Sequence, residues 1–387
     1  MIDIKKKSEC CGCYACTNIC PKQCIEMKID NEGFWYPEVD KDRCIDCSLC
    51  EKVCPELATP KKEEFKTIAY ACKNRNENVR LSSSSGGVFT SLCEYVINNG
   101  GVVFGVAFNE KFEVEHMEAT TIEECEKFRG SKYVQSKIGE TYKSAKKYLN
   151  EGRIVLFTGT QCQIKGLNLF LRKKYNNLIA VDIVCHGVPS PRVFNLYKEN
   201  LKKEYNSEIN SISFRDKSNG WKNYRYRISF KDGQVDQKLH HNNIYSKGFL
   251  KDLYLRPSCY SCEAKNFKSN SDITLADYWG VQNKHAEFDD DKGISLILVN
   301  SEKGQEIFTK ISSDIEVIDT DLDYAISYNP SLVKHVEYNK DRDKFFEELN
   351  NDNLEQLIYK YTKITLVQKV KNKVKGLLSK IKRKLLK

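Results

Sequence analysis

The chain has 387 residues, of which 40% are hydrophobic and 30% are charged, a composition typical of a soluble globular protein with two or three domains. No apolar run approaches the roughly 20 residues that cross a membrane, and 17 cysteines without a preceding secretory signal favour metal ligation in a reducing cytoplasm over disulfides. The net charge of +9 is concentrated in residues 363–387, which hold ten Lys or Arg and no acid, so the remaining chain is nearly neutral.

Eight cysteines among the first 54 residues form two copies of one spacing, Cys-x2-Cys-x2-Cys-x3-Cys-Pro. This is the bacterial run that binds 4Fe–4S clusters, in which the fourth cysteine of each run ligates the cluster of the other run. Zinc sites do not account for the final x3-Cys-Pro. The extra Cys11 and Cys24 are interpreted as small buried thiols, with replacement of one of the ligands as the alternative. The spacing predicts two clusters, one held by Cys10, Cys13, Cys16 and Cys54 and the other by Cys44, Cys47, Cys50 and Cys20.

Both runs lie in a predicted ferredoxin module, residues 1–57, whose middle contains a hairpin around residues 33–37 that covers a cluster with aromatic side chains. A polar stretch at 59–64 is predicted to be a linker. From 65 to 340 apolar strands alternate with helices, which indicates a mixed α/β domain. Strands are predicted at 68–73, 101–108, 153–157, 178–184, 211–214, 224–230 and 294–300, and helices at 82–98, 137–150, 163–174 and 191–204.

A run of serines and glycines opens the helix predicted at 82–98 and includes Ser85, Gly86 and Gly87. Free backbone N–H groups at the start of a helix suit a phosphate or a dinucleotide pyrophosphate, and a flexible turn is the alternative interpretation. No G-x-G-x-x-G sequence follows a predicted strand, so a standard nicotinamide-binding Rossmann site is not indicated.

Four further cysteines form a second candidate site. Cys162 and Cys185 follow two predicted strands, at the edge where an α/β sheet binds its ligands. Cys259 and Cys262 form a close pair later in the chain. Four thiols are enough for a third 4Fe–4S cluster, while buried inert thiols, a zinc site and a redox dithiol stay open as alternatives.

The end of the chain, 350–387, is predicted to be helical. Apolar residues recur at helical spacing between the lysines from 366 to 385, which is typical of a basic amphipathic helix. Reversible binding to an anionic membrane surface and packing on the body or on a partner both account for this pattern. Nucleic acid is not predicted as a partner, because no aromatic or Arg-rich pattern supports contacts with bases.

Six short blocks follow one another along the chain: Ser-Gly-Gly at 85–87, Gly-Ser-Lys-Tyr-Val-Gln-Ser at 130–136, Gly-Thr-Gln-Cys-Gln at 159–163, Val-Cys-His-Gly-Val-Pro-Ser at 184–190, Arg-Pro-Ser-Cys-Tyr-Ser-Cys at 256–262 and Ser-Asp-Ile-Thr-Leu-Ala-Asp-Tyr-Trp-Gly at 271–280. In this order they resemble the coenzyme F420 hydrogenase/dehydrogenase beta-subunit family. The resemblance covers about residues 1–340 and includes the ferredoxin module that many bacterial members carry.

The resemblance implies FAD beside a 4Fe–4S cluster in the large domain. One departure is Gln161, which stands where the family usually has proline before the first cluster cysteine. The cysteines that match the family's cluster are Cys162, Cys185, Cys259 and Cys262, so the resemblance favours the third cluster. The positions that match FAD-binding residues are Ser85, Gly86, Gly87, Ser131, Lys132, Tyr133, Thr160 and Asp277.

The predicted fold is thus an α+β, ferredoxin-like two-cluster module (1–57) fused to a mixed α/β flavin-binding domain (65–340), followed by a C-terminal amphipathic helix (350–387). The family includes flavoproteins that reduce the deazaflavin coenzyme F420 and a plant reductase that acts on a chlorophyll intermediate. Bacterial members resemble accessory oxidoreductases of surface-polysaccharide gene clusters.

The resemblance implies a cytoplasmic iron–sulfur flavoprotein oxidoreductase, in peripheral contact with the inner face of the membrane if its tail binds lipid. Electrons from a ferredoxin or another donor pass through the clusters and FAD to an unknown organic substrate, or in reverse. Lys132 and His186 are predicted to stabilise the reduced flavin or protonate the product; a loop lysine and a hydrogen-bonded histidine beside the cluster are the alternative. The rival functions are an electron-transfer subunit without its own substrate and a scaffold for glycan enzymes.

Overall fold

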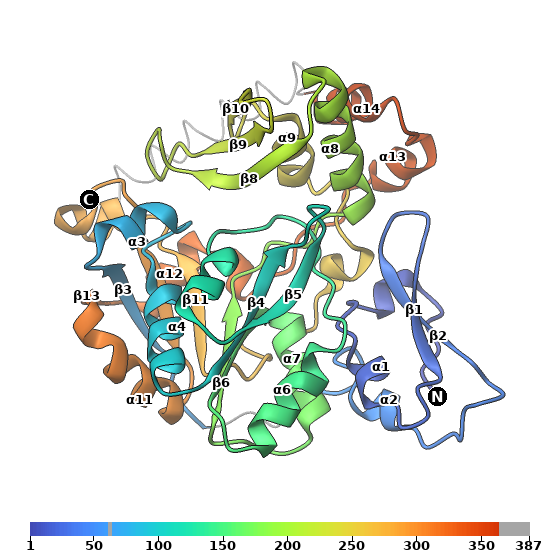
Figure 1. The fold of residues 1–387 in the computed structure, drawn as a ribbon, viewed down its shortest axis with the longest axis horizontal. Helices are drawn as coiled ribbons and strands as arrows, with labels where there is room; N and C mark the ends of the chain where they lie inside the picture. Colours follow the sequence, from blue (N-terminus) through green and yellow to red (C-terminus); the bar gives the residue numbers. More distant parts are fainter. Residues whose placement is uncertain (61–63, 364–387) are drawn as a thin grey trace, which may run out of the picture.

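The computed structural model describes residues 1–60 and 64–363. Three bodies pack together: an N-terminal module, a large α/β body built on an eight-stranded sheet, and a smaller layer built on a three-stranded sheet (Figure 1). The predicted ferredoxin-like region and mixed α/β domain are confirmed at this level.

The N-terminal module is a hairpin beside two short helices. The predicted hairpin is present, with β1 (Ile25–Ile29) antiparallel to β2 (Trp35–Val39). The helices α1 (Ala15–Ile19) and α2 (Leu49–Lys52) carry the third cysteine of each run. Phe34, at the turn of the hairpin, is fully buried and joins the core of the smaller layer, so the hairpin contributes to docking the module.

The large sheet has the strand order β13-β3-β12-β11-β7-β6-β4-β5. Its four inner strands, from β11 to β4, are parallel, and the strands outside them pair antiparallel. The strands are β3 (Ile68–Asn74), β4 (Val102–Phe108), β5 (Val114–Ala119), β6 (Val155–Thr160), β7 (Leu178–Ile183), β11 (Ile273–Asp277), β12 (Ser295–Val299) and β13 (Ile315–Thr320).

Helices cover both faces of this sheet, because successive strand residues point to opposite sides. Val103 of β4 packs against α4 (Val88–Asn98) and α11 (Glu302–Ile311), whereas the adjacent Val102 packs against α6 (Thr141–Asn150) and α7 (Gln161–Leu171). The remaining helices of this body are α3 (Glu77–Ser82), α5 (Ile122–Cys125), α10 (Val281–Lys284) and α12 (Leu322–Tyr328).

The smaller layer is an antiparallel sheet, in the order β10-β9-β8, covered by helices from two parts of the chain. Ser190 caps the first of these helices through its Oγ, which accepts from Val193 N at 3.1 Å, and Pro191 occupies the first helical position. The elements are β8 (Ile209–Asp216), β9 (Arg225–Phe230), β10 (Val235–Leu239), α8 (Pro191–Tyr205), α9 (Ile244–Leu250), α13 (Arg342–Glu348) and α14 (Leu354–Thr362).

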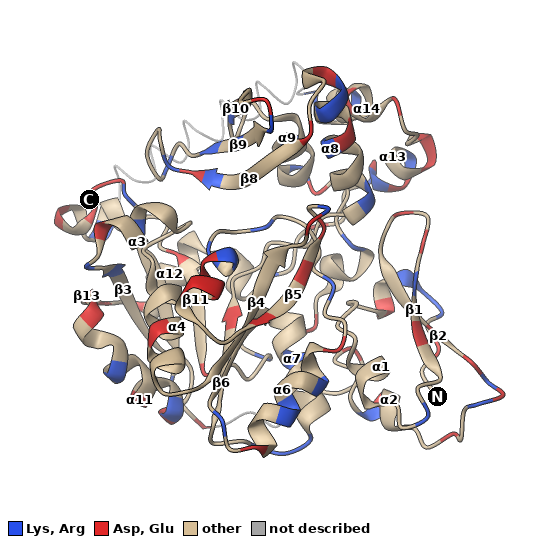
Figure 2. Cartoon of the chain, in the orientation of Figure 1, with Lys and Arg blue, Asp and Glu red and all other residues tan. Residues whose placement is uncertain are grey.

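The predicted C-terminal tail begins at residue 350, and its first part is α14. Leu357 and Ile358 of this helix are buried in the core of the smaller layer. Residues 364–387, which carry the predicted basic amphipathic helix, lie outside the described residues. In the described part of the chain, no helix combines the length and apolarity needed to span a membrane. Basic and acidic residues are interspersed over its elements (Figure 2).

One arginine joins the module to the large body. The guanidinium of Arg256 is fully buried, and its three nitrogens donate to Cys10 O at 2.6 Å, Gln135 Oε1 at 3.0 Å and Trp35 O at 2.8 Å. The same group lies 4.3 Å from the ring centre of Tyr36. Because the guanidinium presents its donors in a fixed fork, a single side chain holds both cysteine loop and hairpin in register with the large body.

Glycines allow the module to approach closely. A Cβ on Gly12 (φ +70°) would lie 2.5 Å from Gln135 Nε2 and 2.9 Å from Arg256 Nη1. A Cβ on Gly166 of α7 would lie 3.0 Å from both Cβ and Sγ of Cys13. The cysteine loop of the module therefore packs directly against α7.

We expect Arg256→Met to lower the stability of the protein by about 3 kcal/mol or more, because each buried carbonyl left without a donor costs roughly 1–3 kcal/mol. Arg256→Lys, which keeps the charge but not the fork, should fall between this variant and the parent. Arg225→Met on β9 is the control, because the Arg225 guanidinium makes only a long hydrogen bond, of 3.5 Å to Asn219, within the described residues. Urea unfolding checks the prediction, and an equal midpoint for Arg256→Met and the control would contradict it.

Candidate functional site

The first cysteine quartet surrounds a hollow beside the hairpin. Cys10, Cys13 and Cys16 from the first run and Cys54 from the second line it together with Cys11. This is the crossed set that the spacing predicts, with the fourth cysteine supplied by the other run. Since this hollow adjoins α7 through Cys13, we call it the proximal site.

The second quartet surrounds a hollow further from the large body, which we call the distal site. Cys44, Cys47, Cys50 and Cys20 line it, again with an extra thiol, Cys24. The sulfurs of Cys20 and Cys24 are 3.4 Å apart. Cys47 is exposed. The distal site is therefore the one that opens to solvent.

Both runs use the same local conformation. The residue after the second cysteine is left-handed in each, Tyr14 with φ 62° and Ser48 with φ 55°, and each precedes the short helix that carries the third cysteine. The chain thereby turns three thiols of one loop toward a common hollow. The repeated spacing in the sequence therefore corresponds to a repeated backbone conformation.

The thiols of the proximal site are in an environment that disfavours free thiolates. Burial raises the pKa of Cys16 well above its usual range, and the thiols of Cys10 and Cys54 raise it further. Burial also raises the pKa of Cys54 to about 11. Within residues 1–60 and 64–363, no three His, Cys, Asp or Glu side chains converge as ligands of a single metal ion would. Four thiols around a hollow instead suit a cubane, in which each thiolate binds a different iron and proton loss accompanies loading.

The third set of cysteines lies where the large body meets the module. Cys162 is in the first turn of α7, and Cys185 follows β7. Cys259 lies within the 3-10 helix η3 (Pro257–Ser261), and Cys262 directly follows it. Burial raises the pKa of Cys185 to about 12, and the nearby thiols of Cys162 and Cys262 raise it too. Burial likewise raises the pKa of Cys259 well above its usual range, and the nearby thiol of Cys185 raises it further. The structure thus brings the four predicted thiols together.

Parallel strands and a glycine bring these cysteines together. β6 and β7 are adjacent and parallel, so Cys162 and Cys185 follow strand ends at the same edge of the sheet. A Cβ on Gly187 would lie 2.7 Å from Leu255 Cδ1, and the bridge between Pro189 and Leu255 holds the segment that leads to Cys259. The backbone N–H of Val188 donates to Cys259 Sγ at 3.4 Å.

The predicted Ser and Gly loop lies between α3 and α4. Ser85 Oγ donates to Ile294 O at 2.8 Å, and Gly86 is buried where a Cβ would lie 2.4 Å from Cys72 O. Gly87, with φ +86°, is the residue before α4. A side chain at Gly86 would separate this loop from the sheet, so the loop geometry depends on glycine.

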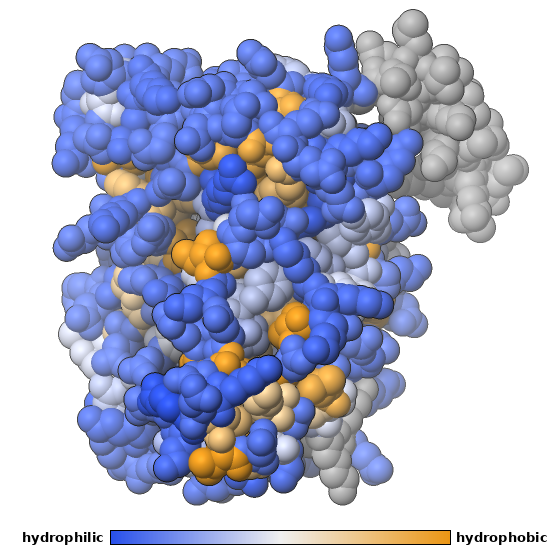
Figure 3. Space-filling model, turned by 90° about the vertical axis from the view of Figure 1, so that its right-hand side faces the viewer, coloured by the Kyte–Doolittle hydropathy of each residue, from blue (hydrophilic) through white to orange (hydrophobic). Residues whose placement is uncertain are grey.

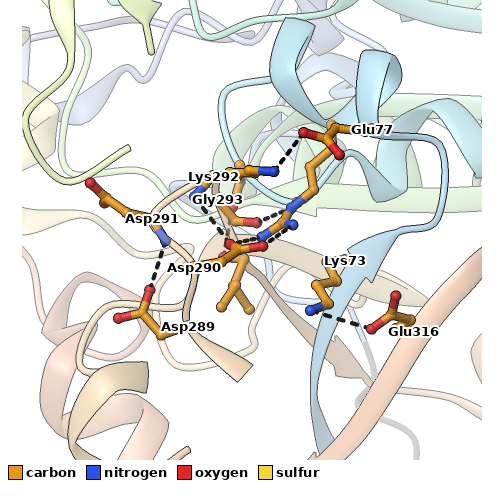
Figure 4. A network of polar contacts seen from close by, with 12 residues as sticks. Lys73, Glu77, Asp289, Asp290, Asp291, Lys292, Gly293 and Glu316 are labelled. Carbon is orange, nitrogen blue, oxygen red and sulfur yellow. Dashed lines mark hydrogen bonds and ion pairs between the residues drawn. The ribbon is translucent and has the colours of Figure 1, made fainter. Parts of the chain in front are cut away.

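A network of polar contacts holds α3, the helix before this loop, against residues 289–293 (Figure 4). Arg80 of α3 donates to Asp290 Oδ2 at 2.6 Å and to Gly293 O at 2.8 Å. Lys292 pairs with Glu77 at 2.6 Å. Arg80 is itself buried, so its contacts with residues 290 and 293 fix the position of α3. Since the Ser and Gly loop begins where α3 ends, the start of this loop is fixed as well.

Several predicted FAD-binding residues meet at a buried arginine, Arg215 of β8. Its guanidinium donates to Asp277 Oδ2 at 2.7 Å, to Tyr133 OH at 3.2 Å and to Ser84 O at 3.2 Å. Ser131 N donates to Ser84 Oγ at 2.7 Å. The Nε of Arg215 is buried without a hydrogen-bond partner. Of the predicted positions, Tyr133 and Asp277 contact Arg215 directly, and Ser131 is joined to it through Ser84, the residue before Ser85. Sequence reasoning missed Arg215.

Lys217, two residues further along, was missed as well. Its Nζ donates to the carbonyls of Arg80, Ser85 and Lys292 at 2.7–2.8 Å, and burial lowers its pKa to about 7. The only signal in the sequence was the pair of cations in Arg-Asp-Lys at 215–217, which a solvent-exposed strand end would also show.

The other predicted residues lie elsewhere. Thr160 caps α7, with its N and Oγ1 donating to Gln163 Oε1 at 2.9 and 3.0 Å, and lies 3.3 Å from Cys162 Sγ. Lys132 turns its Nζ to the carbonyls of Lys127 and Arg129, and burial lowers its pKa to about 7. His186 Nε2 lies 2.5 Å from Asp252 Oδ1, with 38% of the side chain exposed. Thr160 and His186 therefore accompany the third cysteine set rather than the Arg215 region.

Three family models match parts of the chain. Residues 9–58 match the family described as 4Fe-4S dicluster domain. Two further matches are to coenzyme F420 hydrogenase/dehydrogenase, beta subunit: residues 69–142 match its N-terminal part and residues 152–323 its C-terminal part. No curated protein matches the chain.

Among solved structures, the chain is similar to a chain of the xenon-derivatised F420-reducing NiFe hydrogenase complex from Methanosarcina barkeri. The two are 16% identical, the match covers 78% of this chain and 93% of that chain, and the TM-score is 0.46. Two matches to one family follow each other in order and cover most of the α/β part. Together with the match of the module to a dicluster domain, they determine the assignment. The chain belongs to the coenzyme F420 hydrogenase/dehydrogenase beta-subunit family, whose members are iron–sulfur electron-transfer oxidoreductases, and carries a 4Fe–4S dicluster domain at its N-terminus.

Proposed function

We propose that the chain is an FAD-dependent iron–sulfur oxidoreductase that exchanges electrons with a ferredoxin or another carrier and reduces, or in reverse oxidises, an organic substrate. The observation that supports this most is the position of Cys162 in the first turn of α7. Gly166, one turn along the same helix, packs on Cys13 of the proximal site. Since four residues rise about 6 Å along a helix, the proximal site and the third cysteine set are separated by about one turn.

The donor set at the third site fits a 4Fe–4S cluster, because Cys185, Cys262 and Cys162 lie near enough to Cys259 to raise its pKa, and the backbone N–H of Val188 already donates to Cys259 Sγ. Cys162, Cys185, Cys259 and Cys262 would hold it. When bound, clusters at the three sites supply one-electron carriers. The backbone N–H that donates to Cys259 Sγ favours the reduced state of a cluster bound there.

FAD is proposed beside the Ser and Gly loop, around Arg215. The buried Nε of Arg215 has no acceptor, which fits a polar or anionic ligand group at this place. Its guanidinium is also 4.1 Å from the ring centre of Tyr224 and 5.5 Å from that of Trp279, aromatic surfaces that suit a flavin. When bound, FAD supplies two-electron chemistry. Lys132, which stands between Ser131 and Tyr133, is the proposed proton donor at this place. His186 is proposed as a proton donor from the side of the third cysteine set, where it pairs with Asp252.

The distal site is proposed as the contact for the external electron carrier. Cys47 is exposed, and Ile45 beside it is 58% exposed. The face of the molecule that carries the module is mostly hydrophilic and is interrupted by separate apolar patches (Figure 3). The resemblance to bacterial members further suggests a precursor of a surface polysaccharide as the substrate.

Anaerobic purification followed by iron, sulfide and flavin quantitation tests this function. We expect about twelve irons, as three cubanes, and about one FAD per chain. Cys259→Ser should retain about eight irons because the module is untouched, whereas Cys72→Ser, which removes a buried thiol in the core of the sheet, should retain all. Eight irons and no flavin in the parent chain would contradict the proposal and favour an electron-transfer subunit without its own substrate.

A second experiment tests the FAD site separately. Arg215→Lys keeps the charge that pairs with Asp277 but removes the unpartnered Nε, so we expect the flavin content to fall at least tenfold while the iron content is unchanged. Arg225→Lys on β9 is the control and should retain flavin. Full flavin in Arg215→Lys would place FAD elsewhere.

The predicted basic tail is proposed to bind anionic membrane surfaces. A chain ending at Lys363 lacks nine of the ten clustered basic residues and should lose binding to vesicles that contain anionic lipid, since each basic residue near such a surface contributes about 1 kcal/mol. Vesicle sedimentation measures this, with vesicles of neutral lipid as the control. Equal sedimentation of the shortened and full chains would disprove membrane binding by the tail.

A further inference from the structure

A buried lysine, Lys165 of α7, stands between the proximal site and the third cysteine set. Its side chain is 1% exposed, and its Nζ donates to Pro55 O at 2.5 Å and to Glu263 O at 3.3 Å. Pro55 follows Cys54 and lines the hollow of the proximal site. Glu263 follows Cys262 of the third set. One ammonium group therefore contacts the segment next to each site.

The helix that carries Lys165 contacts both sites as well. Cys162 lies in the first turn of α7. Gly166, the residue after Lys165, packs on the proximal site, where a Cβ would lie 3.0 Å from Cys13 Sγ. Lys165 thus lies between the position of α7 that belongs to the third set and the position that touches the proximal site.

The hydrogen bonds of Lys165 do not neutralise its charge, because both acceptors are backbone carbonyls. The carboxyl of Glu56, the residue after Pro55, is close enough to interact with this charge, but it forms no hydrogen bond with Lys165 in the described part of the chain. Lysine is almost never fully buried unless it is paired, since a lone buried charge is costly. A negatively charged group bound on either side of Lys165 would compensate for this charge. A cubane held by four thiolates is such a group.

We propose that Lys165 is a positioning residue whose buried charge raises the reduction potentials of the proximal and third clusters together, while its two hydrogen bonds hold the sites at a fixed separation. This inference rests on the proposed third cluster. Reduction adds one negative charge to a cluster, so a nearby cation out of contact with water stabilises the reduced form. When one electron passes from the proximal to the third cluster, the first is oxidised and the second reduced, and the same ammonium stabilises the electron on either side.

The test uses the full-length chain, purified anaerobically, in three variants. Lys165→Met removes both the charge and the hydrogen-bond donor. Lys165→Gln removes the charge but keeps a donor, so it tests the charge even if Lys165→Met fails to assemble. Lys165→Arg keeps the charge.

The matched control is Lys198→Met. Lys198 of α8 is also buried, and its Nζ also donates to two carbonyls, Lys111 O at 2.8 Å and Phe112 O at 3.2 Å. These acceptors belong to the connection between β4 and β5, which carries no cysteine.

Iron per chain is measured first, and the midpoint potentials are then followed by EPR. Each signal is assigned through a variant that lacks it, Cys16→Ser for the proximal site and Cys259→Ser for the third. We expect both neutral variants to retain about twelve irons and to show lower potentials for the proximal and third clusters. A tenfold smaller equilibrium constant for one-electron reduction corresponds to 59 mV. The distal potential should stay unchanged in them, and Lys165→Arg and Lys198→Met should leave all three potentials unchanged.

Full iron with unshifted proximal and third potentials in Lys165→Gln and Lys165→Met would overturn the role of this charge alone. Loss of iron from all three Lys165 variants would overturn it too, because Lys165 would then serve only to hold the structure together. A parent chain without the third signal would instead refute the third cluster itself, and this inference with it.

Discussion

The burial of the Arg256 guanidinium between the module and the large body is the constraint on which the arrangement of the sites depends. A buried charge is costly unless it is fully hydrogen-bonded, and here every nitrogen donates to an oxygen from a different segment. The same residue begins the segment that carries Cys259, so the contact that docks the module also positions one side of the third cysteine set. Its positive charge beside Cys10 would offset the negative charge of a thiolate-bound cluster.

A second buried arginine plays the same structural role between the two α/β layers. Arg215 comes from β8 of the smaller layer, and its partner Asp277 ends β11 of the large sheet. The candidate FAD residues thus lie where two bodies are held together by a buried ion pair, as the candidate cluster residues lie where Arg256 joins two others. Removing one partner of such a pair leaves an uncompensated buried charge and destabilises the contact between the two bodies. The geometry of each candidate site therefore depends on the contact that its arginine makes. Cofactor content and docking should therefore change together when these arginines are altered.

The features that depend on local spacing could be predicted from the sequence. The cysteine runs predicted the crossed quartets, because the helix after each second cysteine is set by residues within the run, and the alternation of apolar segments predicted β4, β6, β7 and β12. The role of Arg215 could not be predicted, because no neighbouring residue in the chain indicates that this side chain of β8 pairs with Asp277 of β11. Thr160 was grouped with the flavin positions, yet Thr-x-x-Gln at 160–163 is the pattern of a helix cap, and Thr160 caps α7. Arg256 is the first residue of the family block at 256–262. Its hydrogen bonds to Cys10 and Trp35, however, depend on how the module packs against the large body.

The proposed electron path runs through three cysteine quartets in series, from the exposed distal site to the large body. An anomalous difference map at the iron edge, from crystals of the anaerobically purified chain, tests it most directly. We expect three peaks: one between Cys20 and the second run, one between Cys54 and the first run, and one enclosed by Cys162, Cys185, Cys259 and Cys262. Two peaks confined to the module would contradict it.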